Sequence, residues 1–154
     1  MKIIQVTQFV ALFLLMLVTG IFWGTWFSLS RSIQVFSAEE FIHIGKTIIS
    51  NLAVSMRFIM PSCILFMLLS IWFYPQKNSP GFYFSISAIV FIIISLLITL
   101  LVEVPIDNQI KEWTTSTIPS GWNAIRNRWE TFHGLGTFAS LESFASFSAS
   151  ILFH

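Results

Sequence analysis

The sequence predicts an all-α membrane protein: an up-down bundle of four transmembrane helices with a short amphipathic cap helix and an extended fourth helix. Composition is the first reason, because 55% of the 154 residues are hydrophobic and only 10% are charged, whereas about 25% is usual in soluble domains. Apolar runs are the second reason, because about 20 apolar residues suffice for a helix to cross a membrane. Four such runs occupy about residues 6–28, 58–74, 82–104 and 131–153, within a single transmembrane domain over residues 1–154.

The first apolar run is predicted to be a retained helix rather than a cleaved signal peptide. The apolar part of a signal peptide has about 7–15 residues and ends at small residues. This run instead continues through Trp23, Trp26 and Phe27. Within it, Gly20 and Gly24 have the GxxxG spacing, which allows another helix of the bundle or of another subunit to approach closely.

The connections between the runs lie on two sides. Residues 75–81 form a short turn, so the second and third helices should be antiparallel neighbours. On the opposite side, the segment 29–57 contains a capping box, with Ser37 as the N-cap and Glu40 three residues later. The apolar residues Phe41, Ile44 and Ile48 then share one face. We therefore expect a short amphipathic helix at the bundle mouth or the membrane interface.

The second cap segment, residues 105–130, begins as a loop and ends in the start of the fourth helix, with Ser120 as the predicted N-cap. A helix from Ser120 to Phe153 would be about 50 Å long, which exceeds the roughly 30 Å hydrocarbon core. Its first three turns must therefore project from the membrane, or the helix must bend at Gly134 and Gly136.

The charged residues exclude one class of partner and indicate an orientation. The net charge is +1 and the basic residues are scattered, so nucleic acid is not an expected partner. Lys2 and Lys77 lie on the side of the short turn. The basic residues on the cap side are Arg31, Lys46, Arg57, Lys111, Arg126 and Arg128. By the positive-inside rule, this excess places the cap in the cytoplasm.

Metal, cofactor and disulfide sites are not expected. Cys63 is the single cysteine and lies in an apolar run, where it serves as a small buried side chain. His43 and His133 show no spacing typical of metal ligands. We therefore predict neither a metal nor a cofactor.

The start of the fourth helix, WNAIRNRWETFH at residues 122–133, places aromatic, basic and histidine side chains on one face. Trp122, Arg126, Trp129 and His133 follow steps of four, three and four residues. Interfacial anchoring explains part of this pattern, because an exposed cation–π contact contributes about 0.5–1 kcal/mol and both residue types favour the interface. The other interpretation is one wall of a site.

Glu103 favours the second interpretation. It lies at the end of the third apolar run, where an unpaired carboxylate is costly, so it must have a partner. Asp107 lies one helical turn later and carries the same charge, so repulsion between the two carboxylates favours a different partner for Glu103. The predicted partner is a cation on the same side: Arg126, Arg128 or Arg57.

Two arrangements of this end follow from the residues alone. A largely apolar pocket with a few converging polar groups is typical of a small-molecule site. A structural ion pair that fixes the third helix against the fourth is the alternative. The residues concerned are Glu103, Asn108, Trp122, Arg126, Trp129 and His133.

Glu142 lies half-way along the fourth run, among serines 140, 143, 146, 148 and 150. An acid within a membrane span suggests a function by default. The alternative is a protonated or hydrogen-bonded carboxyl inside the bundle or at a subunit contact, with the serines as small packing residues. The sequence assigns Glu142 no role.

Two segments carry a resemblance to a known family. VEVPIDNQIKEW at residues 102–113 and WNAIRNRWETFH at residues 122–133, preceded by residues 37–41, resemble the anthrone oxygenase-like family of small bacterial and fungal membrane proteins, most of which have no assigned function. The resemblance covers about residues 6–145 and implies the same fold in a multi-pass protein of the bacterial inner (plasma) membrane. In the branch that gives the family its name, the activity is oxidation of an anthrone to an anthraquinone with molecular oxygen.

The resemblance also implies site residues. The family's characteristic polar and aromatic positions correspond here to Asn108, Trp113, Trp122, Arg126, Trp129 and His133. A cofactor-independent oxygenase would use His133 as a base and Arg126 to stabilise oxyanion charge. Glu103, Asn108 and the tryptophans would bind an aromatic or quinone-like lipophile. The alternative is a non-catalytic membrane subunit or scaffold that forms homo-oligomers among membrane lipid, with a structural Glu/Arg network.

Overall fold

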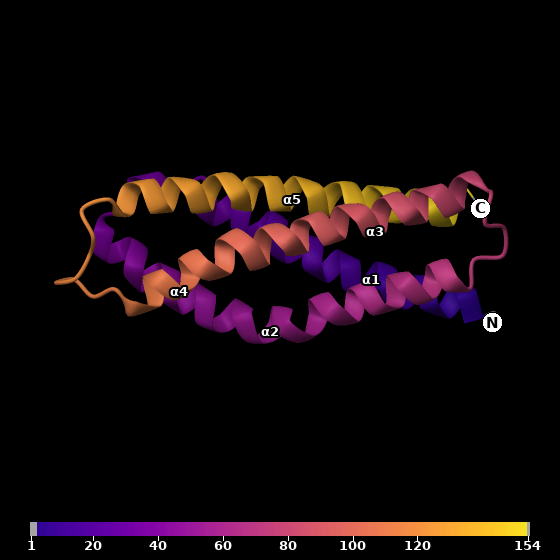
Figure 1. Cartoon of the computed structure of the whole chain (residues 1–154), viewed down its shortest axis with the longest axis horizontal. Helices are drawn as coiled ribbons and strands as arrows, with labels where there is room; N and C mark the ends of the chain where they lie inside the picture. The colour runs from indigo at the N-terminus through magenta and orange to yellow at the C-terminus, as the bar shows by residue number, and fades with distance from the viewer. Residues whose placement is uncertain (1–2, 154) are drawn as a thin grey trace.

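The computed structural model describes residues 3–153, in which every regular element is a helix and none is a strand. Lys2, one of the two basic residues on the short-turn side, lies outside the described residues. Figure 1 shows the long helices lying side by side, with both ends of the chain at one end of the bundle. The elements are α1 (Ile3–Gly24), the π-helical η1 (Thr25–Ser30), the 3₁₀-helical η2 (Ile33–Val35), α2 (Ala38–Trp72), α3 (Pro80–Ile98), the π-helical η3 (Thr99–Glu103), α4 (Val104–Glu112) and α5 (Trp122–Leu152).

Three helical stretches are long and apolar enough to cross a membrane: Ile3–Val35, Ala38–Trp72 and Pro80–Glu112. The protein is therefore a membrane protein. The remaining long helix, α5, is less apolar because Glu142 and several serines interrupt its apolar residues. Most of these serines point inward, since Ser140, Ser143, Ser146 and Ser150 are all buried.

The inward serines and threonines join the helices through backbone carbonyls. The Ser143 hydroxyl donates to the Ala88 carbonyl at 2.7 Å, and the Thr19 hydroxyl donates to the Ser140 carbonyl at 3.2 Å. Such bonds need close helix approach, which small residues permit. They hold α5 against α3 on one side and α1 on the other, while α1 also packs along α2. As a result, α2 and α5 lie across the bundle from each other (Figure 1).

An apolar core fills the middle of the bundle. Leu15 of α1, Met67 of α2, Ile92 of α3 and Phe147 of α5 are fully buried there. Cys63 is buried in the same cluster, as the sequence predicts for a small apolar side chain.

The predicted cap helix is wrong as a separate element. Ser37 does form the capping box, because its hydroxyl accepts from the Glu40 amide at 3.3 Å and its amide donates to the Glu40 carboxylate at 2.9 Å. The helix that begins there, however, continues without a break to Trp72. Nothing between residues 46 and 60 breaks a helix, and Pro61 lies within α2 without ending it.

Two further sequence predictions need correction, and two open alternatives are narrowed. The predicted loop after the third run is helical as α4, which η3 joins to α3. The N-cap of α5 is Gly121 rather than Ser120, and no side chain caps this helix. Of the two ways to place a long fourth helix, the structure shows a single continuous helix without a break at the glycines. Gly20 and Gly24 are exposed, and a Cβ atom added at either would meet no other atom within 4 Å, so they do not serve helix approach within the bundle.

Two tyrosines, one buried and one exposed, test the packing at the end of the bundle where the chain begins and ends. The buried Tyr74 hydroxyl donates to the Ser150 carbonyl at 2.9 Å, whereas Tyr83 is 60% exposed. Tyr74→Phe should lower the free energy of unfolding by about 1 kcal/mol, because it leaves that carbonyl without its donor. Tyr83→Phe is the matched control. Thermal unfolding in a mild detergent measures both, and equal melting temperatures for the two variants would contradict this packing.

Candidate functional site

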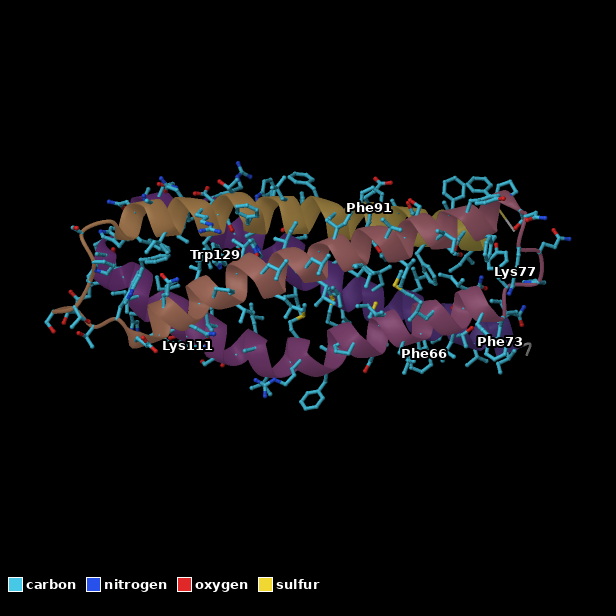
Figure 2. The ribbon with its side chains drawn as sticks, in the orientation of Figure 1. Phe66, Phe73, Lys77, Phe91, Lys111 and Trp129 are labelled. Atoms are coloured by element: carbon cyan, nitrogen blue, oxygen red, sulfur yellow. The ribbon has the colours of Figure 1, made fainter. Side chains whose placement is uncertain are left out.

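The polar end of the bundle lies opposite the chain termini. It is built by η1 and η2, the first turns of α2, α4 and the first half of α5. Figure 2 shows Trp129 and Lys111 at this end and Lys77 and Phe73 at the other. Ile33, Phe41, Ile106 and Ile110 form a second apolar core there, on which Trp122 and Trp129 pack.

A buried acid–histidine pair lies at the inner edge of this end. The Glu103 Oε1 atom is 2.8 Å from His133 Nδ1, and each residue is only 6% exposed. The Thr99 hydroxyl donates to Glu103 Oε2 at 2.8 Å, so each carboxylate oxygen has a donor. The predicted arginine partner is therefore wrong, because no Glu–Arg pair occurs among residues 3–153. Glu103 ends η3 facing α5 at the level of His133.

Two aromatic rings hold the imidazole of His133. The Trp129 ring stacks on it at 4.7 Å between centroids and 7° between planes, and the Phe22 ring lies at 5.7 Å. A neutral imidazole that donates from Nδ1 to a carboxylate carries its lone pair on Nε2. This Nε2 atom is buried and has no protein partner. The arrangement thus fixes an imidazole whose free nitrogen can accept a proton.

Arg126 lies two turns before His133 on the same helix and is also buried. Its Nη2 atom donates to Gln34 Oε1 at 2.6 Å, and its guanidinium lies over the Trp122 ring at 4.9 Å. Gln34 in turn donates to the side chains of Asn127 and Glu130. Arg126 therefore stabilises the contact between η2 and α5, and its buried Nε atom has no partner in the protein.

Asp107 borders a small cavity. It lies one turn after Glu103 and accepts a hydrogen bond from the Trp129 side chain, while its buried Oδ1 atom has no partner. The cavity measures about 30 Å³ and lies between α2, η2, α4 and Trp129, with Gly45 in its wall. Its other walls are leucine, isoleucine and phenylalanine side chains, so Asp107 is the one charged group lining it.

Unpartnered buried polar atoms gather at this end. Five side-chain atoms of this kind occur in residues 3–153, and four of them are Ser30 Oγ, Asp107 Oδ1, Arg126 Nε and His133 Nε2. Buried polar groups are nearly always hydrogen-bonded, so a cluster of exceptions needs an explanation. Together with the apolar cavity, they have the composition of a small-molecule site.

The structure brings some predicted site residues together and separates others. Glu103, Trp129 and His133 are in contact, and Arg126 with Trp122 extends the same face. Asn108 is exposed and accepts from Lys111 at 3.3 Å. The Trp113 carbonyl accepts from Lys46 at 2.6 Å, and its ring packs on the second core.

Three contributors to this site were not predicted from the sequence. Thr99 lies four residues before Glu103, and this helical spacing could have identified it. Gln34 gave no signal, because its partner Arg126 lies 92 residues later in the chain, and Ser30 belongs to no motif. Within residues 3–153, no cluster of three or more His, Cys, Asp or Glu side chains could hold a metal ion.

Comparison with known proteins assigns the family. A family model described as anthrone oxygenase matches residues 50–146. The chain belongs to the anthrone oxygenase family. The match covers well over half of the chain and includes Glu103, Asp107, Arg126, Trp129 and His133, which confirms the resemblance noted from the sequence. No curated protein and no solved structure matches this family member significantly.

The Glu103–His133 pair makes a prediction about stability. Glu103→Ala should lower the free energy of unfolding by about 3–5 kcal/mol, because removing one partner leaves the other buried and unpaired. Glu103→Gln retains an acceptor for Nδ1–H and should lose less. Thermal unfolding in detergent measures the difference, with the exposed Glu112→Ala as the control. Wild-type melting of Glu103→Ala would show that the pair does not stabilise the fold.

Proposed function

We propose that this anthrone oxygenase family member is an enzyme of the bacterial inner membrane with four transmembrane helices, which oxidises a planar aromatic lipophile with molecular oxygen. The observation that carries the proposal is His133 Nε2, a buried nitrogen without a protein partner on an imidazole oriented by Glu103. A carboxylate-oriented imidazole is the usual general base of proteins.

The reaction begins with proton abstraction from carbon. His133 Nε2 takes a proton from the methylene group of an anthrone, and the electron pair of the C–H bond moves into the rings to leave an oxyanion. Glu103 stabilises the imidazolium that forms, because its carboxylate already accepts from Nδ1–H. The aromatic rings of Trp129 and Phe22 keep water from the pair.

Molecular oxygen then serves as the oxidant. The carbanion transfers an electron to dioxygen, a C–O bond forms, and the resulting peroxide takes the proton back from His133. Loss of the second C–H proton with cleavage of the O–O bond releases water and leaves a carbonyl. The balance is anthrone plus dioxygen to anthraquinone plus water. Arg126 can stabilise the oxyanion through Nε–H, since this donor has no protein partner.

The cavity beside Asp107 indicates where the aromatic ring system of the substrate would bind. Its volume of about 30 Å³ suits a molecule the size of water or dioxygen. A tricyclic ring needs the first turns of α2 to move away from α4, and Gly45, which has no side chain, lies in the wall of the cavity on α2. Trp129 borders both this cavity and His133, so a ring inserted beside Trp129 would have its edge toward the base.

The membrane arrangement rests on the inward serines of α5. Because these hydroxyls bond to carbonyls of other helices or of α5 itself, the helix hides much of its polar surface and can serve as the fourth span. The basic residues of the polar end favour the cytoplasmic side for the site.

Histidine variants test the base. His133→Ala should lower anthrone-dependent oxygen uptake about 10²–10⁴-fold, the usual contribution of a general base. His43→Ala is the matched control, because His43 is exposed on α2. Oxygen uptake and the absorbance of anthraquinone are followed together with purified protein in detergent. Equal activity in wild type and His133→Ala, with both folded, would refute the proposed role.

Gly45 tests the position of the ring. A Cβ atom added there would contact the Ile110 side chain at 3.5 Å, an ordinary distance, so Gly45→Ala should fold normally. It would also fill part of the cavity and should raise the KM for anthrone several-fold. Gly20→Ala is the control, because nothing lies near Gly20. An unchanged KM would exclude the cavity as the ring site.

A further inference from the structure

Two charged side chains face outward from the membrane-crossing part of the bundle on opposite sides. Glu142 is exposed on α5, and Arg57 is exposed on α2. The Glu142 carboxylate accepts only from Ser146, at 3.2 Å, and Arg57 makes no hydrogen bond or ion pair in the described structure. Because α2 and α5 lie across the bundle from each other, these two side chains cannot meet within one chain.

The contacts of α5 place Glu142 deep in the membrane. Ser140 and Ser143, its neighbours on α5, bond to α1 at Thr19 and to α3 at Ala88. Both contacts lie well inside the apolar stretches Ile3–Val35 and Pro80–Glu112. Glu142 therefore faces hydrocarbon, where an ionisable side chain is costly and seeks a partner.

Arg57 lies at a comparable depth. The rings of Phe41 and Trp122 are 5.6 Å apart near the starts of α2 and α5, and Tyr74 bonds to Ser150 near their ends. The two helices therefore run in the same direction, and Arg57 is about half-way between these contacts. The half-way point of α5 between the same contacts lies six residues before Glu142, which is about 9 Å along the helix at 1.5 Å per residue. Arg57 and Glu142 are therefore offset by about 9 Å in depth. Two long side chains can span such an offset.

We propose that a second copy of this chain covers these faces, with α5 of one copy packed on α2 of the next and Glu142 paired with Arg57. Charge complementarity selects this arrangement, because a two-fold contact of like faces would bring Glu142 against Glu142 or Arg57 against Arg57. A head-to-tail contact instead satisfies both charges and closes into a ring when its rotation permits.

The helix faces around the two charges suit such a contact. On α5, the exposed residues Leu135, Phe138, Glu142 and Ala145 follow steps of three and four, which form one stripe. On α2, Val54, Phe58 and Leu65 are exposed around Arg57. Only 17% of the most apolar stretch of α2 is buried within one chain, the lowest share of the three apolar spans.

A charge exchange tests the proposal. Glu142→Arg and Arg57→Glu are made singly and together, and native mass spectrometry in a mild detergent gives the oligomeric state. We expect an oligomer for the wild type, predominantly monomer for each single variant, and recovery of the oligomer in the double variant. Lys77→Glu, at an exposed position in the turn after α2, is the control and should remain oligomeric.

A mixing experiment covers the case in which a reversed charge prevents membrane insertion. Glu142→Gln and Arg57→Gln each remove one partner without reversing a charge, so each variant alone should be monomeric. When the two variants are mixed, Glu142 of an Arg57→Gln copy can pair with Arg57 of a Glu142→Gln copy. Mixed dimers should therefore form. A monomeric wild type, oligomers of both single variants, or dissociation by Glu142→Gln without effect of Arg57→Gln would each overturn the proposal.

Discussion

The hydrogen bond between Glu103 and His133 determines what the polar end of this protein can do. A carboxylate at the edge of an apolar bundle needs donors, and this one receives them from Thr99 on its own helix and His133 on α5. The same contact joins η3 to α5 and selects the imidazole nitrogen that stays free. The stability of this end and the reactivity we propose for it thus depend on one pair, and the rings of Trp129 and Phe22 pack against its imidazole.

The class of fold could be predicted from composition, because an apolar chain with few charges has few alternatives to spanning helices. The capping box at Ser37 could also be predicted, since both of its hydrogen bonds join residues only three positions apart. The continuity of α2 was not, because the boundary between a polar and an apolar stretch does not end a helix. The segment before residue 58 is more polar than the segment after it, yet both belong to one unbroken helix, because hydropathy does not determine where a helix ends.

The candidate site was predictable where it depends on helical spacing. Arg126, Trp129 and His133 share one face, and the structure places that face toward the third helical run. The partner of Glu103 was not predictable, because several basic residues and one histidine were compatible with its depth. Position along α5 decided the outcome: His133 lies beside Glu103, while Arg126, two turns earlier, bonds to Gln34, 92 positions before it in the chain.

The π-helical segment η3 ends at Glu103 itself, and η1 ends at Ser30, whose hydroxyl is among the unpartnered atoms. A π-turn holds an extra residue relative to an α-helix, so it turns everything beyond it by about 100°. If Thr99–Glu103 wound as an α-helix instead, the sequence of α4 would be unchanged, but Asp107 would face a different neighbour. Relatives of the same length that wind this segment as an α-helix would therefore carry the same string of amino acids with a different inner face. Aligning them letter by letter through this turn would equate positions that do not correspond in space.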